Sequence, residues 1–205
     1  MVTASGSAAA AASGSPSDTA AAAPAPVGES SRPRSLAELA GSVPDPELPV
    51  ITLAELGVLR RVTEPEPGHV LVELTPTYTG CPAVEAMAAD IERVLRTEAG
   101  AEKVEVHTVL SPPWSSDDIS EEGRRKLAEY GIAPPRPGAR ASAPVQVGLS
   151  PTRHATEPTR EAEPVRCPHC GAAETELLSR FSSTACKALR RCTACREPFD
   201  HFKEV

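Results

Sequence analysis

Residues 69–98, HVLVELTPTYTGCPAVEAMAADIERVLRTE, contain the change of hydrophobic period that decides the fold. Over His69–Thr75 apolar and polar residues alternate, which is typical of a strand with one buried face. From Ala83 to Glu98 the period becomes that of an amphipathic helix. Its apolar stripe consists of Val84, Met87, Ile91, Val94 and Leu95. The stretch therefore predicts a strand, a short loop and a long helix.

The segments on either side of this unit predict a small α+β domain over residues 35–135. Ser35-Leu36-Ala37-Glu38 matches the S-x-x-E capping box of a helix N-terminus. The turn residues 64–68 join a strand at 58–62 to the strand at 69–75, which predicts a hairpin. The remaining expected elements are a turn of helix at 53–56, a third strand at 103–109 and a helix at 120–130. We therefore expect a short sheet with helices packed on one face.

The rest of the chain divides into three parts by composition. Residues 1–34 are dominated by Ala, Ser, Gly and Pro, which predicts a disordered tail. Residues 136–164 carry repeated prolines, which predict a linker. Residues 165–205 contain five of the six cysteines, four of them as two spaced pairs. We expect this last part to form a small metal ribbon.

Four cysteines occur as two C-x-x-C pairs, Cys167 with Cys170 and Cys192 with Cys195, separated by 21 residues. Each pair places two sulfurs on one tight turn, so four thiolates can close a tetrahedral shell around one metal ion. A module this small buries little apolar surface, so it usually needs a bound metal ion to fold stably. The pattern favours zinc, with iron as the alternative, because tetrahedral sulfur ligation suits both metals. Disulfides are disfavoured in a reducing cytosol.

Cys81 is the remaining cysteine of the α+β part, in Thr79-Gly80-Cys81-Pro82. If Pro82 occupies the first helical position, Cys81 is the N-cap, and the helix terminus would stabilise its thiolate. Such a thiolate is a metal ligand or a nucleophile; the alternative is an inert cysteine at a strand–helix junction. Asp45 and Glu47 are the acids expected beside it, either as functional groups or as charges that solvate a loop.

Cys186 is the sixth cysteine and lies between the two pairs. Lys187, Arg190 and Arg191 follow it, and such cations can lower the pKa of a thiol. Cys186 is therefore expected to be either a reactive thiol or a small packed residue on a ribbon strand.

Charge and hydropathy exclude several classes of protein. The net charge is −7, and residues 45–138 hold 9 Lys or Arg against 17 Asp or Glu, which disfavours a nucleic-acid partner. No run approaches the ~18 uninterrupted apolar residues of a membrane helix. The N-terminus lacks the basic region and compact apolar stretch of a secretory signal. We therefore expect a cytoplasmic protein without a membrane partner.

Several motifs resemble known families. Pro44-Asp45-Pro46-Glu47-Leu48-Pro49-Val50, with Leu56-Gly57-Val58 after it, resembles the opening of the MIP18-like domain of iron–sulfur assembly factors such as SufT. Thr75–Pro82 resembles the cysteine motif of that domain. Ser111-Pro112-Pro113-Trp114 and the C-terminal stretch from Cys167 to Asp200 narrow the resemblance to the PaaD (PaaJ) family of the phenylacetic acid degradation cluster.

This resemblance implies an accessory role in the phenylacetyl-CoA epoxidase system, in the assembly or maintenance of iron–sulfur or di-iron centres. It implies that Cys81, Asp45 and Glu47 hold iron or a cluster transiently. The implied partners are the oxygenase or reductase components or iron–sulfur assembly proteins. A second copy of the chain, in a homodimer, could also supply the ligands that Cys81, Asp45 and Glu47 leave missing around the iron or cluster. The chain lacks the two Glu-x-x-His motifs of a di-iron site and a Gly-rich nucleotide loop, so we expect no catalysis by the chain alone. The alternatives are a general iron–sulfur assembly factor, a thiol-dependent enzyme using Cys81 and a ribbon interaction module.

Overall fold

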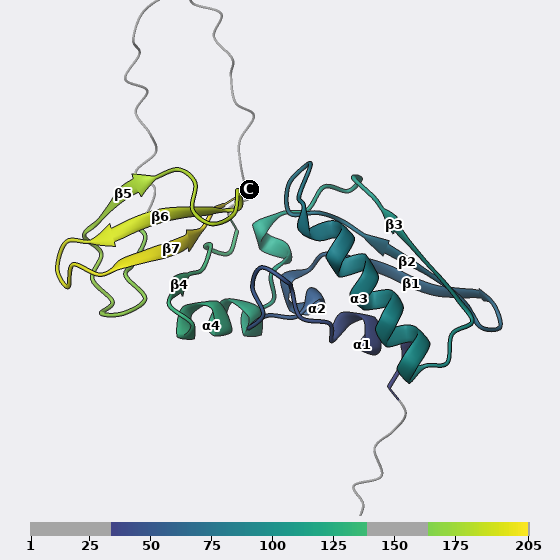
Figure 1. Cartoon of the computed structure of the whole chain (residues 1–205). Coiled ribbons are helices and arrows are strands. Elements are labelled where there is room, and N and C mark those ends of the chain that lie inside the picture. The colour runs from purple at the N-terminus through teal and green to yellow at the C-terminus, as the bar shows by residue number, and fades with distance from the viewer. Residues whose placement is uncertain (1–33, 139–163, 205) are drawn as a thin grey trace, which may run out of the picture. The chain divides into compact units, whose positions relative to one another are not determined.

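The computed structural model describes residues 34–138 and 164–204 (Figure 1). Its first part contains α1 (Leu36–Gly41), α2 (Leu53–Leu56), β1 (Leu59–Glu66), β2 (His69–Leu74), α3 (Ala83–Glu98), β3 (Lys103–Thr108), the 3-10 helix η1 (Ser116–Asp118), α4 (Glu121–Glu129) and β4 (Ile132–Ala133). Its second part contains β5 (Thr175–Ser179), β6 (Lys187–Cys192) and β7 (Pro198–Phe202). The expected tail and most of the expected linker lie outside the described residues.

The first sheet has the strand order β1-β2-β3. β1 and β2 form the expected antiparallel hairpin, whereas β2 and β3 are parallel, and α3 makes the crossover that a parallel pair requires. Val70, Val72 and Leu74 of β2 are fully buried, while the alternate residues are only half-buried. Figure 1 shows α3 lying across one face of this sheet. The α+β architecture with helices on one face of a short sheet is therefore confirmed.

Local sequence signals account for the helix boundaries. Ser35 and Glu38 form the expected capping box, and Ser120 caps α4 by accepting a hydrogen bond from the Gly123 amide at 3.0 Å. Thr52 and Glu55 form a second capping box at α2. On α3, four of the five residues of the apolar stripe are buried and Val84 is half-buried. None of the helices in the described part of the chain has the length and hydropathy that a membrane crossing needs.

The second sheet has the strand order β4-β7-β6-β5, so it includes a strand from the first part of the chain. β4 pairs in parallel with β7 through Ile132–Asp200 and Ala133–His201. Phe202, at the end of β7, is fully buried in the core that the α+β elements form. Its ring centroid lies 5.8 Å from that of Trp114, whose Nε1 donates a hydrogen bond to the Leu56 carbonyl at 2.9 Å. Side chains of both expected domains therefore pack in one core.

Candidate functional site: a four-cysteine centre and a thiol–carboxylate cavity

Two tight backbone turns present the four ribbon cysteines. In the first turn, the Cys167 carbonyl accepts a hydrogen bond from the Gly171 amide at 2.9 Å, and Gly171 has a φ of 76°. In the second turn, the Cys192 carbonyl accepts from the Arg196 amide at 3.1 Å, and Arg196 also has a positive φ of 68°. The two turns have the same design, and each directs its sulfurs at one point.

The four sulfurs of Cys167, Cys170, Cys192 and Cys195 all lie within 4.8 Å of one another. The Cys167–Cys195 and Cys170–Cys192 sulfurs are 3.8 and 3.6 Å apart. A tetrahedron with metal–sulfur bonds of about 2.3 Å has edges of about 3.8 Å, so the set fits one tetrahedral metal ion. Hydrogen bonds from the backbone amides of Cys195 and Ala194 lower the pKa of Cys192 to about 7. The centre has four protein ligands and no open position, which is the arrangement of a structural metal site.

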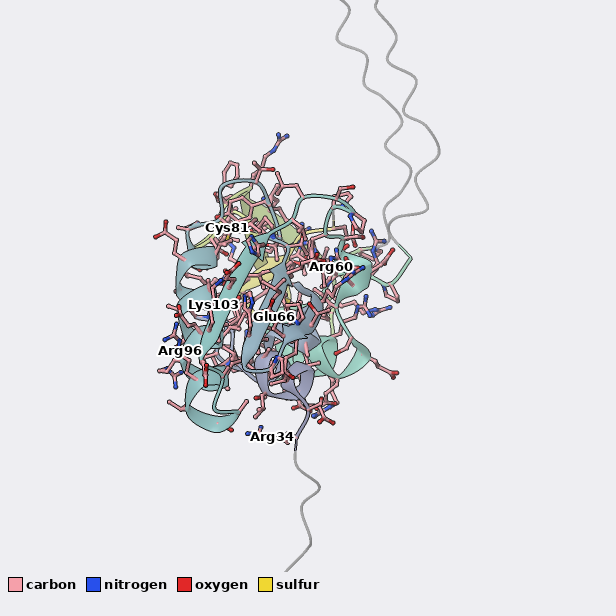
Figure 2. All side chains as sticks on the ribbon, turned by 90° about the vertical axis from the view of Figure 1, so that its right-hand side faces the viewer. Arg34, Arg60, Glu66, Cys81, Arg96 and Lys103 are labelled. Atoms are coloured by element: carbon pink, nitrogen blue, oxygen red, sulfur yellow. The ribbon has the colours of Figure 1, made fainter. Side chains whose placement is uncertain are left out.

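A separate cavity of about 150 Å³ brings together the other candidate residues. Asp45, Glu47 and Cys81 line it from the α+β part, and Cys186 lines it from the ribbon. The lining contains two carboxylates, two thiols and the Tyr78 phenol, with no Lys, Arg or His among the described residues that form it. Figure 2 shows Cys81 at the end of the α+β part opposite to Arg34. The cavity is therefore acidic and rich in sulfur.

Asp45 organises the loop that carries Glu47. Its Oδ1 accepts hydrogen bonds from the amides of Glu47 at 2.9 Å and Leu48 at 2.7 Å. Its own amide donates to the Ile51 carbonyl at 2.9 Å, which closes the loop. The side chain is 3% exposed, and this burial raises the pKa of Asp45 although the two amides and Lys187 act in the opposite direction. Both amides bind the same oxygen, so Asp45 can fix the loop and still present Oδ2.

Cys81 lies one residue outside the position expected from the sequence. The N-cap of α3 is Pro82, and no side chain caps this helix, so the expectation that the Cys81 sulfur caps the helix is wrong. The Cys81 amide donates to the Tyr78 carbonyl at 3.3 Å, which forms a turn ahead of the helix. The thiol is half-buried, and burial together with the neighbouring Cys81 raises the pKa of Tyr78. The turn thus directs the thiol to the cavity, not to the helix amides.

Cys186 lies in the same cavity, although it comes 105 residues after Cys81 in the chain. Its sulfur is 3.0 Å from the Thr184 hydroxyl. Burial raises its pKa, and although Lys187 lowers the pKa as expected, burial is the larger effect, so the net shift is upward. The cations are engaged elsewhere: Lys187 pairs with Asp200 at 3.2 Å, and Arg191 pairs with Glu176. No local pattern predicts that these two cysteines share a cavity, because the β7 contacts that bring them together are long-range.

Two stretches of the chain match known protein families. Residues 39–108 match the family described as iron–sulfur cluster assembly protein, and residues 151–203 match the family described as PaaD zinc beta ribbon domain. The first match includes Asp45, Glu47 and Cys81. The second includes the four cysteines of the metal centre and Cys186.

Individual relatives match either most of the chain or its first part. Over 165 residues the chain is 42% identical to an Escherichia coli (strain K12) protein named as a proposed 1,2-phenylacetyl-CoA epoxidase subunit, covering 80% of this chain and 88% of that protein. It is 29% identical to an Fe-S protein maturation auxiliary factor of Porphyromonas gingivalis, covering 45% of this chain and 87% of the relative. It is 35% identical to the auxiliary factor SufT of Staphylococcus aureus, covering 37% of this chain and 85% of the relative. Among solved structures, a DUF59 domain from Bacillus anthracis matches 45% of this chain and 87% of its own, with 31% identity and a TM-score of 0.42.

The fold and the two sites define an iron–sulfur assembly domain that is followed by a four-cysteine ribbon. The identity to the Escherichia coli protein extends through both parts. The chain therefore belongs to the PaaD family of phenylacetyl-CoA epoxidase subunits.

Proposed function

We propose that this chain is an accessory protein of the phenylacetyl-CoA epoxidase system of aerobic phenylacetate degradation, and that it assists assembly or maintenance of iron–sulfur or di-iron centres. The observation that carries the proposal is the cavity in which Cys81, Asp45 and Glu47 meet. All three residues lie in the segment that matches the iron–sulfur cluster assembly family. The identity to the Escherichia coli protein supports the connection to the epoxidase.

The chemistry of the cavity suits iron or a cluster as transient cargo. Thiolate and carboxylate groups are ligands that iron takes in proteins. Among the described residues, only the four ribbon cysteines form a group whose ligand atoms converge on one point. The cavity residues instead offer an incomplete shell, and a partner protein can supply the missing ligands when the cargo is passed on. An open shell makes release easier than a closed one does.

The same lining argues against a substrate-binding enzyme. Phosphate groups of a coenzyme A thioester are bound by Lys, Arg or helix N-termini; the N-terminus of α3 at Pro82 and Ala83 reaches this cavity, but the carboxylates of Asp45 and Glu47 would repel a phosphate there. The described lining has two carboxylates and no basic side chain, and its volume of about 150 Å³ is small. We assign the chain no reaction of its own. The four-cysteine centre is proposed to hold structural zinc, and the chain to work in the cytoplasm with the oxygenase or reductase components.

A deletion experiment tests this function. The oxygenase and reductase components are purified from a strain that lacks this gene, and from the same strain carrying the wild-type gene or the Cys81→Ser variant. Iron and acid-labile sulfide per protein are measured, together with epoxidation of phenylacetyl-CoA. We expect under-metallated, weakly active components without the gene and with Cys81→Ser, and recovery with the wild type. Normal metal content and activity in the deletion strain would show that the chain has no maturation role.

A general iron–sulfur assembly factor is the second candidate, because the Porphyromonas gingivalis and Staphylococcus aureus relatives are named as Fe-S protein maturation auxiliary factors. The same deletion strain distinguishes the two. Aconitase activity is measured during growth on a carbon source other than phenylacetate. A dedicated epoxidase factor leaves aconitase unchanged, whereas a general factor lowers it.

A further inference from the structure

We propose that Cys186 of the ribbon is a second thiol ligand for the cargo, so that an iron–sulfur cluster is held between the two parts of the chain by Cys81 and Cys186. This inference rests on the proposed function, because it names the ligands of the same site. It assigns a chemical role to a cysteine that lies outside the four-cysteine centre. It also makes the ribbon part of the cargo site and not only a stabilising module.

Cys186 lies in the same cavity as Cys81, which is the first reason for this assignment. Cys81 reaches the cavity from the turn before α3, and Cys186 reaches the same cavity from the loop between β5 and β6. Both thiols are free and half-buried, so each is shielded from bulk solvent yet open to the cavity. The charge on Cys81 influences Cys186, and the charges on both influence Tyr78, which places the three groups within electrostatic range of one another.

The loop that carries Cys186 is held firmly, as a ligand position requires. The Ser182 amide donates to the Lys187 carbonyl at 3.1 Å, and the Lys187 amide donates to the Thr184 carbonyl at 3.2 Å. The Cys186 carbonyl accepts from the Lys203 amide at 2.9 Å, one residue after the buried Phe202. The loop is thereby tied to β7, and β7 is anchored in the α+β core. Hydrogen bonds around a metal-ligating residue hold its side chain in the orientation that metal binding requires.

The ribbon metal has no need of Cys186. Four other sulfurs already close its shell, and Cys186 does not belong to their group. Cys186 packs against the α+β core, and its only described side-chain hydrogen-bond partner is the Thr184 hydroxyl. Its presence beside Cys81 is explained if the cavity binds a thiophilic ligand.

The charge of the cavity points to a cation-bearing ligand. Asp45, Glu47 and the two thiols line it, and no basic side chain does. Lys187 is the cation that acts on Asp45, but it is buried and paired with Asp200 at 3.2 Å. Asp45 is buried and Glu47 is exposed beside it, and the Glu47 charge contributes to the raised pKa of Asp45, so a cation bound next to them would stabilise both carboxylates. Iron supplies that charge, and each thiol releases its proton when it binds.

The arrangement favours a cluster over a single ion. The ribbon sulfurs converge on one point, as a mononuclear site requires, whereas the cavity thiols and carboxylates form no such compact group. A cluster presents several iron atoms at its surface, so its protein ligands stand further apart. Two protein thiols leave the other iron positions for a donor or recipient protein, which fits transfer and not permanent storage.

The test uses the full chain with its ribbon loaded with zinc, verified by elemental analysis. Wild type, Cys81→Ser, Cys186→Ser and Ser183→Ala are incubated anaerobically with equal amounts of ferrous and ferric iron and with sulfide, and are then separated from free reagents. Ser183 lines the same cavity from the same loop, so Ser183→Ala is the matched control. Bound iron, acid-labile sulfide and the visible absorption of thiolate–iron bonds are measured. We expect wild type and Ser183→Ala to bind a cluster, and each cysteine variant to lose about tenfold or more in occupancy.

A second measurement uses only the wild-type protein, so its result does not depend on whether a variant folds. Alkylation of the cysteines is followed by mass spectrometry before and after loading. A cluster held by both thiols protects Cys81 and Cys186 together. If Cys186 stays reactive after loading, or if Cys186→Ser binds the cluster as wild type does, the inference about Cys186 is wrong. The proposed function still stands in that case, provided that Cys81→Ser loses cluster binding. If the wild type binds no cluster, or Cys81→Ser binds as much, both fail.

Discussion

Replacing Phe202 with alanine should weaken the α+β part of the molecule although Phe202 belongs to the ribbon. The side chain is fully buried and lies against Trp114, and both belong to the core that α3 and β2 help to form. Removing a buried phenylalanine side chain costs about 3–5 kcal/mol, because transfer and cavity terms add. For a chain of this length, 1 kcal/mol corresponds to about 2–4 °C in Tm, so the expected decrease is about 6–20 °C.

The assay is thermal unfolding at a fixed excess of zinc, followed by far-ultraviolet circular dichroism for α3 and by Trp114 fluorescence for the shared core. Zinc must be held constant because metal binding contributes to folding. Phe181→Ala is the matched control. Phe181 lies in the same ribbon but is 63% exposed and contacts the Lys203 ammonium at 4.7 Å, so its loss should cost about 1 kcal/mol or less. If Phe202→Ala left the helix transition at its wild-type temperature, the shared core would be refuted.

Three further predictions concern the pH response, the loop around Gly57 and the metal. Burial, assisted by Arg190 and Arg136, lowers the pKa of His201 to about 4 from 6.5. The stability that neutral His201 contributes is therefore fully present above pH 6.5 and is lost as the pH falls toward 4. His201→Gln should remove up to about 3 kcal/mol of this pH dependence, measured as the free energy of unfolding in urea between these pH values. Gly57→Ala should lower the free energy of unfolding by about 2–4 kcal/mol, which a lower urea midpoint would show. The reason is that Gly57 has a φ of 74° and that a Cβ there would lie 2.3 Å from the Asp118 carbonyl oxygen. Cys192→Ser should lose the bound metal, since three thiolates cannot close the shell; unchanged metal content by elemental analysis would contradict the assignment.

Much of the α+β part follows from local sequence signals. The helix at Ala83–Glu98 has the predicted bounds, because its apolar stripe is long and Gly100 follows directly after its C-cap, Ala99. The capping box at Ser35 and the hairpin of β1 and β2 depend on residues close together in the chain. Such features are encoded within a few residues and need no knowledge of the tertiary structure.

Features that depend on distant contacts did not follow from the sequence. Ile132 and Ala133 carry no pattern that predicts pairing with β7, since two residues are too few for a period. The proximity of Cys186 to the cavity arises from that pairing and from the burial of Phe202, not from any motif. The sequence predicts Cys81 at the N-cap, whereas the structure has Pro82 there with φ −69° and ψ −19°; a shift of one residue at a helix end leaves no trace in the local composition.

The shared core has a consequence for the order of events during synthesis. β7 is the last strand of the chain, and Phe202 and the Cys186 loop complete the wall of the cavity. The α+β elements leave the ribosome well before this wall exists, and domains generally begin to fold as they emerge. Cys81 therefore spends this interval in an unfinished pocket. A chain that lacked β7 and the Cys186 loop would present only half of the cavity, so cargo binding depends on residues that are synthesised about 100 positions after Cys81.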